Sequence, residues 1–227
     1  HLKQVLLGAV VLSVAGCGSK DDAPTQRRAK QGVSTSSSTA TQKALDPASV
    51  RKQALTYFAT PPAEATPKSY AMSEEKVALG RNLYFDPRLS KNHDVSCNTC
   101  HDLAKYGVDG EPTSPGHKGQ RGDRNSPTVY NAAFHLAQFW DGRAADVEAQ
   151  AKGPVLNPIE MAMPSEEAVV ATLASIPGYQ EQFKEAFPES GITYDNMATA
   201  IGAFERRLVT PSPFDDFLGG NDAGWLC

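Results

Sequence analysis

The chain has 227 residues, and its 22 lysines and arginines against 26 acidic residues give a formal charge of −4. The apolar fraction of 40% and the charged fraction of 21% are typical of a globular protein of one domain or two small ones, and they exclude a fully disordered chain and a multi-span membrane protein. The mild acidity argues against nucleic acid as a partner, because phosphate binding needs clustered positive charge.

The first 16 residues have the pattern of a secretory signal peptide. Lys3 precedes an apolar run, Val5–Val14, which is too short to span a bilayer, since spanning takes about 20 residues. Residues 14–17, VAGC, resemble the lipobox of bacterial lipoproteins, which implies cleavage before Cys17 and lipidation of its sulfur. An ordinary signal peptide that happens to contain a cysteine is the alternative. We expect a periplasmic, membrane-anchored lipoprotein, and Gly18 after the cysteine resembles outer-membrane sorting.

Residues 17–50 comprise the lipidated cysteine and a polar stretch rich in Ser and Thr, which predicts a disordered tether. Basic side chains outnumber acidic ones in residues 1–50, and the reverse holds from residue 51 on. Residues 51–220, which we expect to form the folded domain, are therefore more acidic than the whole chain. Residues 221–227, which end in Cys227, form an atypical C-terminal tail.

Helical patterns dominate from residue 73 on, and no segment alternates as a strand does. The strongest pattern places Met197, Ile201, Phe204 and Leu208 on one apolar face. The expected helices run from a cap at Ser73 to Asp86, from a cap at Ser165 to Ser175, from Tyr179 to Phe187, and from a cap at Thr193 to Leu208. The stretch Leu103–Pro127 has no periodicity and predicts a long loop. Together these patterns predict an all-α fold with long irregular loops.

Cys97-Asn98-Thr99-Cys100-His101 is the C-x-x-C-H pattern of covalent c-type haem attachment. Two thiols one helical turn apart can both form thioethers with the haem vinyl groups, and the adjacent histidine can ligate the iron from below. A thioredoxin-like dithiol would need an α/β pattern, and a zinc site would need two more paired ligands. The sequence provides neither, so the motif predicts haem c.

Three further histidines outside the signal segment are candidates for the other side of the iron. His93 lies in a loop and reads as a surface residue, and His135, amid apolar neighbours, reads as a satisfied core histidine. His117 lies in the Gly- and Pro-rich loop, where a ligand can be placed over iron and withdrawn.

Several segments resemble the N-terminal half of the bacterial dihaem cytochrome c peroxidases, whose N-terminal haem is the one at which peroxide reacts. The resemblance spans about residues 70–217. Its segments are residues 79–90, 96–101, 107–110, 124–129, 138–144, 150–154, 158–161 and 208–211. It implies a cytochrome c-like helical haem domain.

The resemblance also implies roles for individual residues. Cys97 and Cys100 bind the haem, and His101 and His117 are its proximal and distal iron ligands. The three residues implied in catalysis are Glu160, which moves the peroxide proton, Gln150, which is its polar neighbour, and Trp140, which lies between the two haems. Asn125 is implied as a calcium ligand at the domain interface. Without the resemblance, Glu160 reads as a surface acid, Trp140 as a core aromatic and Asn125 as a turn residue.

The family also carries a second haem in a C-terminal domain, and this chain ends before a second C-x-x-C-H. We therefore expect a truncated chain, which puts its turnover alone in doubt, with exposed apolar surface that includes Trp140. The implied function is reduction of H₂O₂ to water with electrons from a small cytochrome c or cupredoxin, by an enzyme that is a homodimer when full length. The alternatives are a monohaem electron carrier and a dihaem oxidase that modifies tryptophan in a partner protein.

Overall fold

The computed structural model describes residues 46–223. The signal segment, the lipobox cysteine Cys17, nearly all of the expected tether and Cys227 lie outside the described residues. The α-helices are α1 (Pro47–Ala54), α2 (Glu74–Phe85), α3 (Cys97–Cys100), α4 (Val147–Leu156), α5 (Glu166–Ala174), α6 (Pro177–Ala186), α7 (Tyr194–Glu205) and α8 (Pro213–Leu218). The short 3₁₀ turns are η1 (Pro87–Leu89), η2 (Leu103–Lys105), η3 (His117–Gly119) and η4 (Ala132–Phe134). Residues 46–223 contain no strand, only two isolated bridges, so the predicted all-α class is confirmed.

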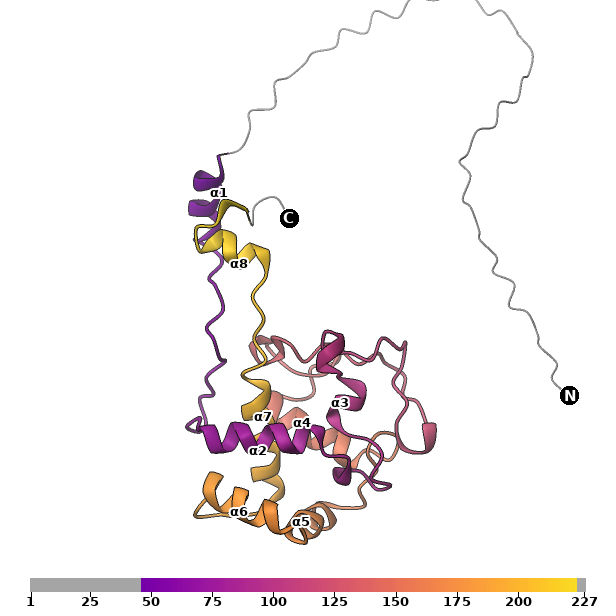
Figure 1. Ribbon diagram of the computed structural model, residues 1–227. Helices are drawn as coiled ribbons and strands as arrows, with labels where there is room; N and C mark the ends of the chain where they lie inside the picture. The colour runs from indigo at the N-terminus through magenta and orange to yellow at the C-terminus, as the bar shows by residue number, and fades with distance from the viewer. Residues whose placement is uncertain (1–45, 224–227) are drawn as a thin grey trace, which may run out of the picture. The chain divides into compact units, whose positions relative to one another are not determined.

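Helices α2 and α7 cross at the centre of the helical body (Figure 1), and a glycine sets how closely they approach. A Cβ atom on Gly80 of α2 would lie 1.7 Å from the carbonyl oxygen of Ala200 on α7. Any side chain at this position would therefore push the helices apart. The predicted apolar face of α7 packs here, and Met197 and Ile201 are fully buried.

Helix α4 also packs against α7. A Cβ atom on Gly202 of α7 would lie 2.7 Å from the carboxyl carbon of Glu148 on α4. Helices α5 and α6 pack against α7 and α2 respectively and complete the core. The largest fully buried apolar side chains of this core outside α7 are Tyr84, Phe183, Leu79, Leu83, Leu89 and Leu173.

The helix starts predicted from capping residues are confirmed. Ser73, Ser165 and Thr193 each accept a hydrogen bond from the backbone N–H three residues later. The bond from Asn196 N–H to the Thr193 hydroxyl is the shortest, at 3.0 Å, and the other two measure 3.3 Å. Such bonds satisfy N–H groups that have no partner inside the helix.

Two helix boundaries differ from prediction. Helix α6 begins at Pro177 rather than at the predicted Tyr179, because proline lacks the N–H that a first helical position leaves unused. Helix α7 ends at Glu205, and Arg206 is its C-cap, so Leu208 lies beyond the helix. The N–H of Leu208 instead donates to the carbonyl of Glu205 in a tight turn.

Ordered structure begins before residue 51, which differs from the expected end of the tether. Asp46 caps α1 by accepting a hydrogen bond from the Ser49 N–H at 3.0 Å, and Pro47 occupies the first helical position. Helix α1 packs against α8, where Arg51 Nε donates to the Phe217 carbonyl at 2.6 Å. No helix within residues 46–223 is long and apolar enough to cross a membrane.

Residues 64–70, which we call the strap, are bonded to the end of α7. The N–H of Ala65 donates to the Arg206 carbonyl at 2.9 Å, and Arg206 Nη1 donates to the Ala65 carbonyl at 3.1 Å. The Tyr70 hydroxyl donates to Glu148 Oε1 at 2.7 Å. Arg206 and Glu148 form an ion pair with two parallel bonds of 2.7 and 2.9 Å. The strap bonds to both members of this pair, through Ala65 and Tyr70.

Candidate active site

Helix α3 carries Cys97 and Cys100 as free thiols three residues apart, so both project from the same side of one turn. The turn is held locally. The Ser96 N–H donates to Thr99 Oγ1 at 2.9 Å, and the Leu103 N–H donates to Asn98 Oδ1 at 3.1 Å. We call residues 96–101 the attachment turn. Its spacing and free thiols fit covalent haem attachment.

Both thiols lie in a poorly solvated environment. Burial, followed by the negative charge of Glu205, raises the pKa of the Cys97 thiol to about 12. Burial also raises the pKa of the Cys100 thiol, and the charges of Asp109 and Glu160 add to this. Both groups therefore remain protonated at neutral pH, which disfavours the thiolate chemistry of a redox dithiol.

The His101 imidazole is oriented by a backbone carbonyl. Its Nδ1 lies 2.9 Å from the carbonyl oxygen of Pro127. A carbonyl can only accept, so Nδ1 carries the proton and Nε2 keeps a free lone pair. Burial lowers the pKa of His101, which favours the neutral, ligating form. Histidines that bind metals are commonly held by such a bond from the second ring nitrogen.

Two loops distant in sequence meet at the second part of the site, and we call residues 116–120 and 157–161 the loop pair. The His117 N–H donates to the Glu160 carbonyl at 2.8 Å. A Cβ atom on Gly116 would lie 2.2 Å from the Ile159 carbonyl oxygen, so only glycine permits this approach. The predicted pair His117 and Glu160 is thus brought together across 43 residues of sequence.

The His117 ring has room for a ligand role. The residue is only 6% exposed, and its Nδ1 is buried without a hydrogen-bond partner among residues 46–223. A buried polar atom without a partner is unfavourable unless a bound group satisfies the ring. Together with the thiols and the free Nε2 of His101, this imidazole fits an iron porphyrin with axial histidine ligands.

The Glu160 carboxyl is held and partly desolvated. Asn157 Nδ2 donates to its Oε1 at 2.9 Å, and the Asn157 Oδ1 accepts the Ile159 N–H at 3.0 Å. Burial raises the pKa of Glu160, with Arg143 and Asn157 opposing the shift. Glu160 is close enough to Cys100 for its charge to raise the pKa of that thiol. A carboxyl whose pKa is raised near the attachment turn accepts and holds a proton more readily than an ordinary glutamate does.

Trp140 and Asn125 are joined to each other. Trp140 Nε1 donates to the backbone carbonyl of Asn125 at 2.8 Å, and Asn125 Nδ2 donates to the Glu111 carbonyl at 2.7 Å. The Asn125 side-chain oxygen has no hydrogen bond to the described part of the chain. In residues 46–223 no three His, Cys, Asp or Glu side chains group to hold a metal ion, so calcium at Asn125 stays a prediction.

Trp140 and His135 differ from what their local sequence indicated. Trp140 is 64% exposed rather than a core aromatic, which agrees with the exposed surface expected from the family resemblance. His135 is exposed and not a core histidine, whereas His93 is exposed as expected. Gln150 lies half-buried on α4, and no described hydrogen bond joins its side chain to His117 or Glu160.

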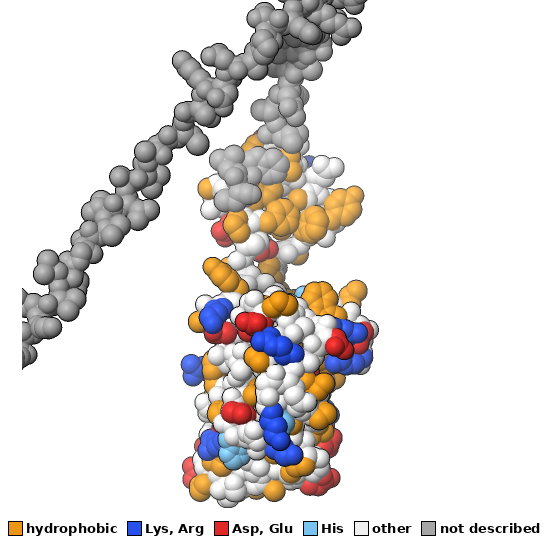
Figure 2. Space-filling view, turned by 90° about the vertical axis from the view of Figure 1, so that its right-hand side faces the viewer, with side chains coloured by type: hydrophobic (Ala, Val, Ile, Leu, Met, Phe, Trp, Pro, Cys, Tyr) orange, Lys and Arg blue, Asp and Glu red, His pale blue; other side chains and the backbone are white. Residues whose placement is uncertain are grey.

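Apolar side chains reach the surface in the segment that contains Trp140. Phe134 is 41% exposed and Leu136 is fully exposed. Hydrophobic side chains lie between charged ones on the face seen in Figure 2.

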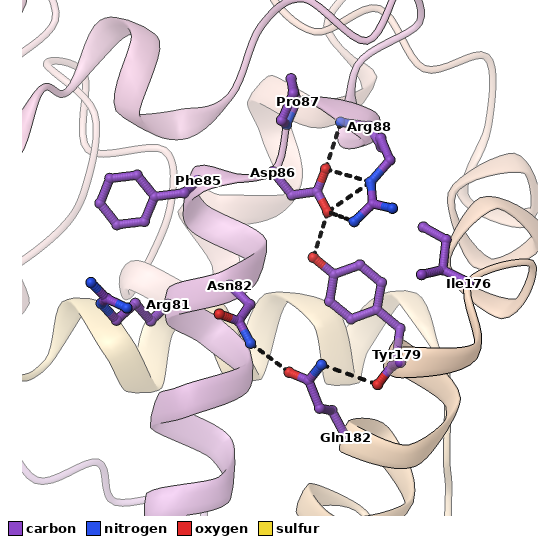
Figure 3. A pocket seen from close by; sticks show the side chains of 10 residues that line it. Arg81, Asn82, Phe85, Asp86, Pro87, Arg88, Ile176, Tyr179 and Gln182 are labelled. Atoms are coloured by element: carbon purple, nitrogen blue, oxygen red, sulfur yellow. Dashed lines mark hydrogen bonds and ion pairs between the residues drawn. The ribbon is translucent and has the colours of Figure 1, made fainter.

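A separate groove of about 720 Å³ lies between α2, η1 and α6 (Figure 3) and contains none of the predicted site residues. The Asp86 carboxylate at its centre accepts bonds from the Tyr179 hydroxyl at 2.6 Å and from Arg88 Nε at 2.9 Å. Asn82 Nδ2 donates to Gln182 Oε1 at 2.7 Å. These bonds join α2 to α6 across the groove and occupy the Asp86, Asn82 and Gln182 side chains.

Residues 74–223 match the sequence profile of the di-haem cytochrome c peroxidases. The chain belongs to the di-haem cytochrome c peroxidase family. This confirms the resemblance carried by the attachment turn and the later segments. Membership of a c-type haem family implies haem c as the cofactor, in agreement with the free thiols and the oriented imidazole.

Relatives within the family include peroxidases and MauG proteins. Cytochrome c551 peroxidase of Pseudomonas aeruginosa is 51% identical over 174 residues, which are 75% of this chain and 50% of the relative. Methylamine utilization protein MauG of Methylorubrum extorquens is 38% identical over 194 residues, 85% of this chain and 53% of the relative. The chain spans about half the length of the curated relatives it matches.

A solved structure has the same fold as this family member. It is described as a MauG-like protein associated with microbial copper homeostasis and is 32% identical, with a TM-score of 0.65. The match covers 71% of this chain and 48% of that chain. The helical arrangement described above is therefore that of a known haem-protein family.

Sequence reasoning missed several residues that position the candidate site of this chain. The Pro127 carbonyl orients His101, Asn157 holds Glu160, and Gly116 permits the contact within the loop pair. The Tyr84 hydroxyl donates to the His101 carbonyl at 2.7 Å. Asn157 carried a signal, since Asn followed by Pro favours a local turn, whereas the other contacts exist only in the folded chain.

Proposed function

We propose that this chain is the peroxidatic half of a di-haem cytochrome c peroxidase and reduces H₂O₂ to water. The observation that carries the proposal is the loop pair. A backbone hydrogen bond joins His117 to Glu160; the ring Nδ1 of His117 is buried without a partner among the described residues, and the carboxyl of Glu160 is partly desolvated. The proximity of Glu160 to Cys100 supports a common site with the attachment turn. The 51% identity to a cytochrome c551 peroxidase agrees with it.

A haem held by Cys97, Cys100 and His101 would supply the redox-active iron at which the peroxide bond is cleaved. The overall reaction consumes two electrons and two protons and yields two waters. Glu160 takes a proton from one peroxide oxygen and returns it to the other, so that water leaves rather than hydroxide. Its raised pKa suits both transfers, and Asn157 holds the carboxyl in place.

In a haem-loaded protein His117 would be the second histidine ligand of the resting iron, and it would have to leave the iron to admit peroxide. Its loop is a tight turn, with Lys118 at φ +56° and Gly119 at φ +71°. We propose Gln150 as a polar neighbour of the peroxide and Trp140 as the aromatic between this haem and a second one. We also propose a calcium ion bound by Asn125 at the interface with that second domain.

The wider setting of the enzyme is also part of the proposal. Electrons come from a small periplasmic cytochrome c or cupredoxin, and Cys17 anchors the chain to a membrane, with the outer membrane favoured. The full-length enzyme is a homodimer, and nucleic acid is not a partner.

The test is the reaction of the haem-loaded chain with H₂O₂ in a single turnover, which requires no second haem. We expect Glu160→Gln to slow this reaction by about 100-fold or more, because proton transfer by a positioned carboxyl typically contributes at least that factor. Glu189→Gln is the matched control. Glu189 is an exposed acid just after the end of α6, and this variant should react as the wild type does. Equal rates for the wild type and Glu160→Gln would refute the role of Glu160.

Two alternatives make different predictions. The first is a di-haem oxidase that modifies tryptophan in a partner protein, for which the 38% identity to a methylamine utilization protein MauG is the support. The second is a monohaem electron carrier. An electron carrier would exchange electrons with a donor but would not react with peroxide in a Glu160-dependent way. A tryptophan oxidase would have no use for His117 over the iron.

A further inference from the structure

Glu205 is a buried carboxyl that the proposed peroxide chemistry does not use. It is the last residue of α7 and is only 6% exposed. No hydrogen bond from residues 46–223 reaches its side chain. A buried carboxylate without partners is costly, so the group needs either a counter-charge or a proton.

The nearest positive charge is committed elsewhere. Arg206 follows Glu205 directly, but its guanidinium makes two parallel bonds to Glu148 and a third to the Ala65 carbonyl. Glu148 also accepts the Tyr70 hydroxyl, and these bonds lower its pKa although burial opposes them. One guanidinium therefore neutralises Glu148 and leaves Glu205 without a counter-ion.

The other titratable groups around Glu205 give it no positive charge. Tyr84 of α2 and Cys97 of α3 both have their pKa raised by its negative charge, after the larger effect of burial. Glu148 of α4 repels it, and only Arg206 attracts it. Burial and the repulsion by Glu148 raise the pKa of Glu205 to about 8. Glu205 thus holds a proton at neutral pH, close to the attachment turn.

We propose that Glu205 couples proton uptake to the reduction of a haem bound at Cys97. At a pH at which Glu205 is partly ionised, delivery of an electron by a one-electron donor draws a fraction of a proton from solvent onto Glu205, and reoxidation releases it. The proton binds a carboxylate oxygen, and no covalent bond to carbon forms or breaks. Glu205 is a positioning residue, since it acts on the charge balance of the site. The proposal rests on haem attachment to Cys97 and not on peroxidase activity.

The physical reason is the charge balance inside a region of low dielectric. An electron added near Cys97 makes the ionised form of Glu205 less favourable, because like charges repel strongly where water is absent. Proton uptake removes that repulsion. By reciprocity, a proton on Glu205 makes reduction easier, so the midpoint potential must fall as pH rises through the titration of Glu205.

The experiment is a redox titration of the haem-loaded full chain between pH 5.5 and 9.5, without peroxide, after its pyridine haemochrome spectrum has shown covalent haem. We expect the midpoint potential of the wild type to fall by at least about 28 mV from pH 5.5 to pH 9.5, which for a one-electron couple is a threefold change in the reduction equilibrium constant. Glu205→Gln should largely flatten the dependence, and Glu205→Asp should restore it. Glu189→Gln is the control at an exposed acid and should retain the wild-type dependence.

A second variant tests the ion-pair geometry. Glu148→Gln leaves Arg206 free to pair with Glu205, so the potential should begin to fall at a lower pH than in the wild type. A Glu205→Gln protein that keeps the wild-type dependence overturns the proposal.

The infrared difference spectrum between reduced and oxidised wild-type protein keeps the proposal testable if Glu205→Gln does not fold. Reduction should increase the carbonyl band of a protonated carboxylic acid, and Glu205→Asp should shift that band. A band that is absent or unmoved overturns the proposal, whereas loss of peroxide reactivity alone does not affect it.

Discussion

The attachment turn and the loop pair are built in different ways. In the attachment turn, Cys97, Cys100 and His101 are neighbours in sequence, and Ser96 and Thr99 stabilise the turn by a local hydrogen bond. In the loop pair, residues more than 40 positions apart meet through a backbone bond from His117 to Glu160. The predicted haem attachment therefore depends on which residues occupy one helical turn, whereas the predicted proton transfer by Glu160 depends on a tertiary contact. The two regions should therefore respond differently to substitution.

The largest expected effect is at the attachment turn. Replacing both Cys97 and Cys100 by serine removes the two thioethers, so haem should be lost from the denatured protein altogether. Haem-specific staining after denaturing electrophoresis measures this directly. Cys227→Ser is the matched control, because it removes a thiol outside the motif and should leave the haem stain unchanged. A double serine variant that still retains covalent haem would show that Cys97 and Cys100 are not the attachment residues.

The same difference between the regions explains what could be predicted from the sequence. The helix caps at Ser73 and Thr193 are local patterns, and their prediction from the residues alone is confirmed. The C-x-x-C-H motif of the attachment turn is equally local, and haem attachment to it stays a prediction. Glu160 could not be distinguished from a surface acid by its neighbours, because its burial comes from segments distant in sequence. It entered the prediction only through family resemblance.

Errors also follow from tertiary context. His135 has apolar neighbours and reads as a core residue, yet Leu136 beside it is fully exposed, so the segment lies on the surface. Helix α4 was not predicted, because Gly153 and Pro154 interrupt its pattern. Glu205 reads as an ordinary charge near a helix end, and only the packing of α7 against α2 and α4 buries it.

The second prediction concerns Glu205, the buried carboxyl whose charge acts on Cys97 of the attachment turn, and uses the pH dependence of stability. Glu205 has an ordinary pKa of 4.5 and a folded-state pKa of about 8, so the folded chain binds its proton more tightly than the unfolded chain does. Its contribution is therefore fully present below pH 4.5 and is lost as pH rises through 8. We expect Glu205 to lower the unfolding free energy of the wild type by roughly 4 kcal/mol between pH 5 and pH 9. This loss should be absent in Glu205→Gln.

Denaturant titrations of the haem-loaded chain at several pH values measure this effect. The difference between Glu205→Gln and the wild type cancels the contributions of the other groups, including the smaller one from Glu160, whose pKa is also raised by burial. The contrary result would be parallel pH profiles for the two proteins, which would place an ionised carboxylate at position 205 throughout.

The smallest expected effect, and the most specific to the loop pair, comes from one added methyl group. In Gly116→Ala the new Cβ would lie 2.2 Å from the Ile159 carbonyl and 2.8 Å from the Glu160 Cα, so the two loops must separate. We expect a loss of about 1–3 kcal/mol in unfolding free energy and a weakened low-spin absorption spectrum, because His117 moves with its loop. Gly122→Ala is the matched control, since an added Cβ there meets nothing within 4 Å. Covalent haem should be retained in both variants, because the attachment turn does not depend on this contact. An unchanged low-spin spectrum in a destabilised Gly116→Ala protein would separate the fold of the loop pair from iron ligation and exclude His117 as the distal ligand.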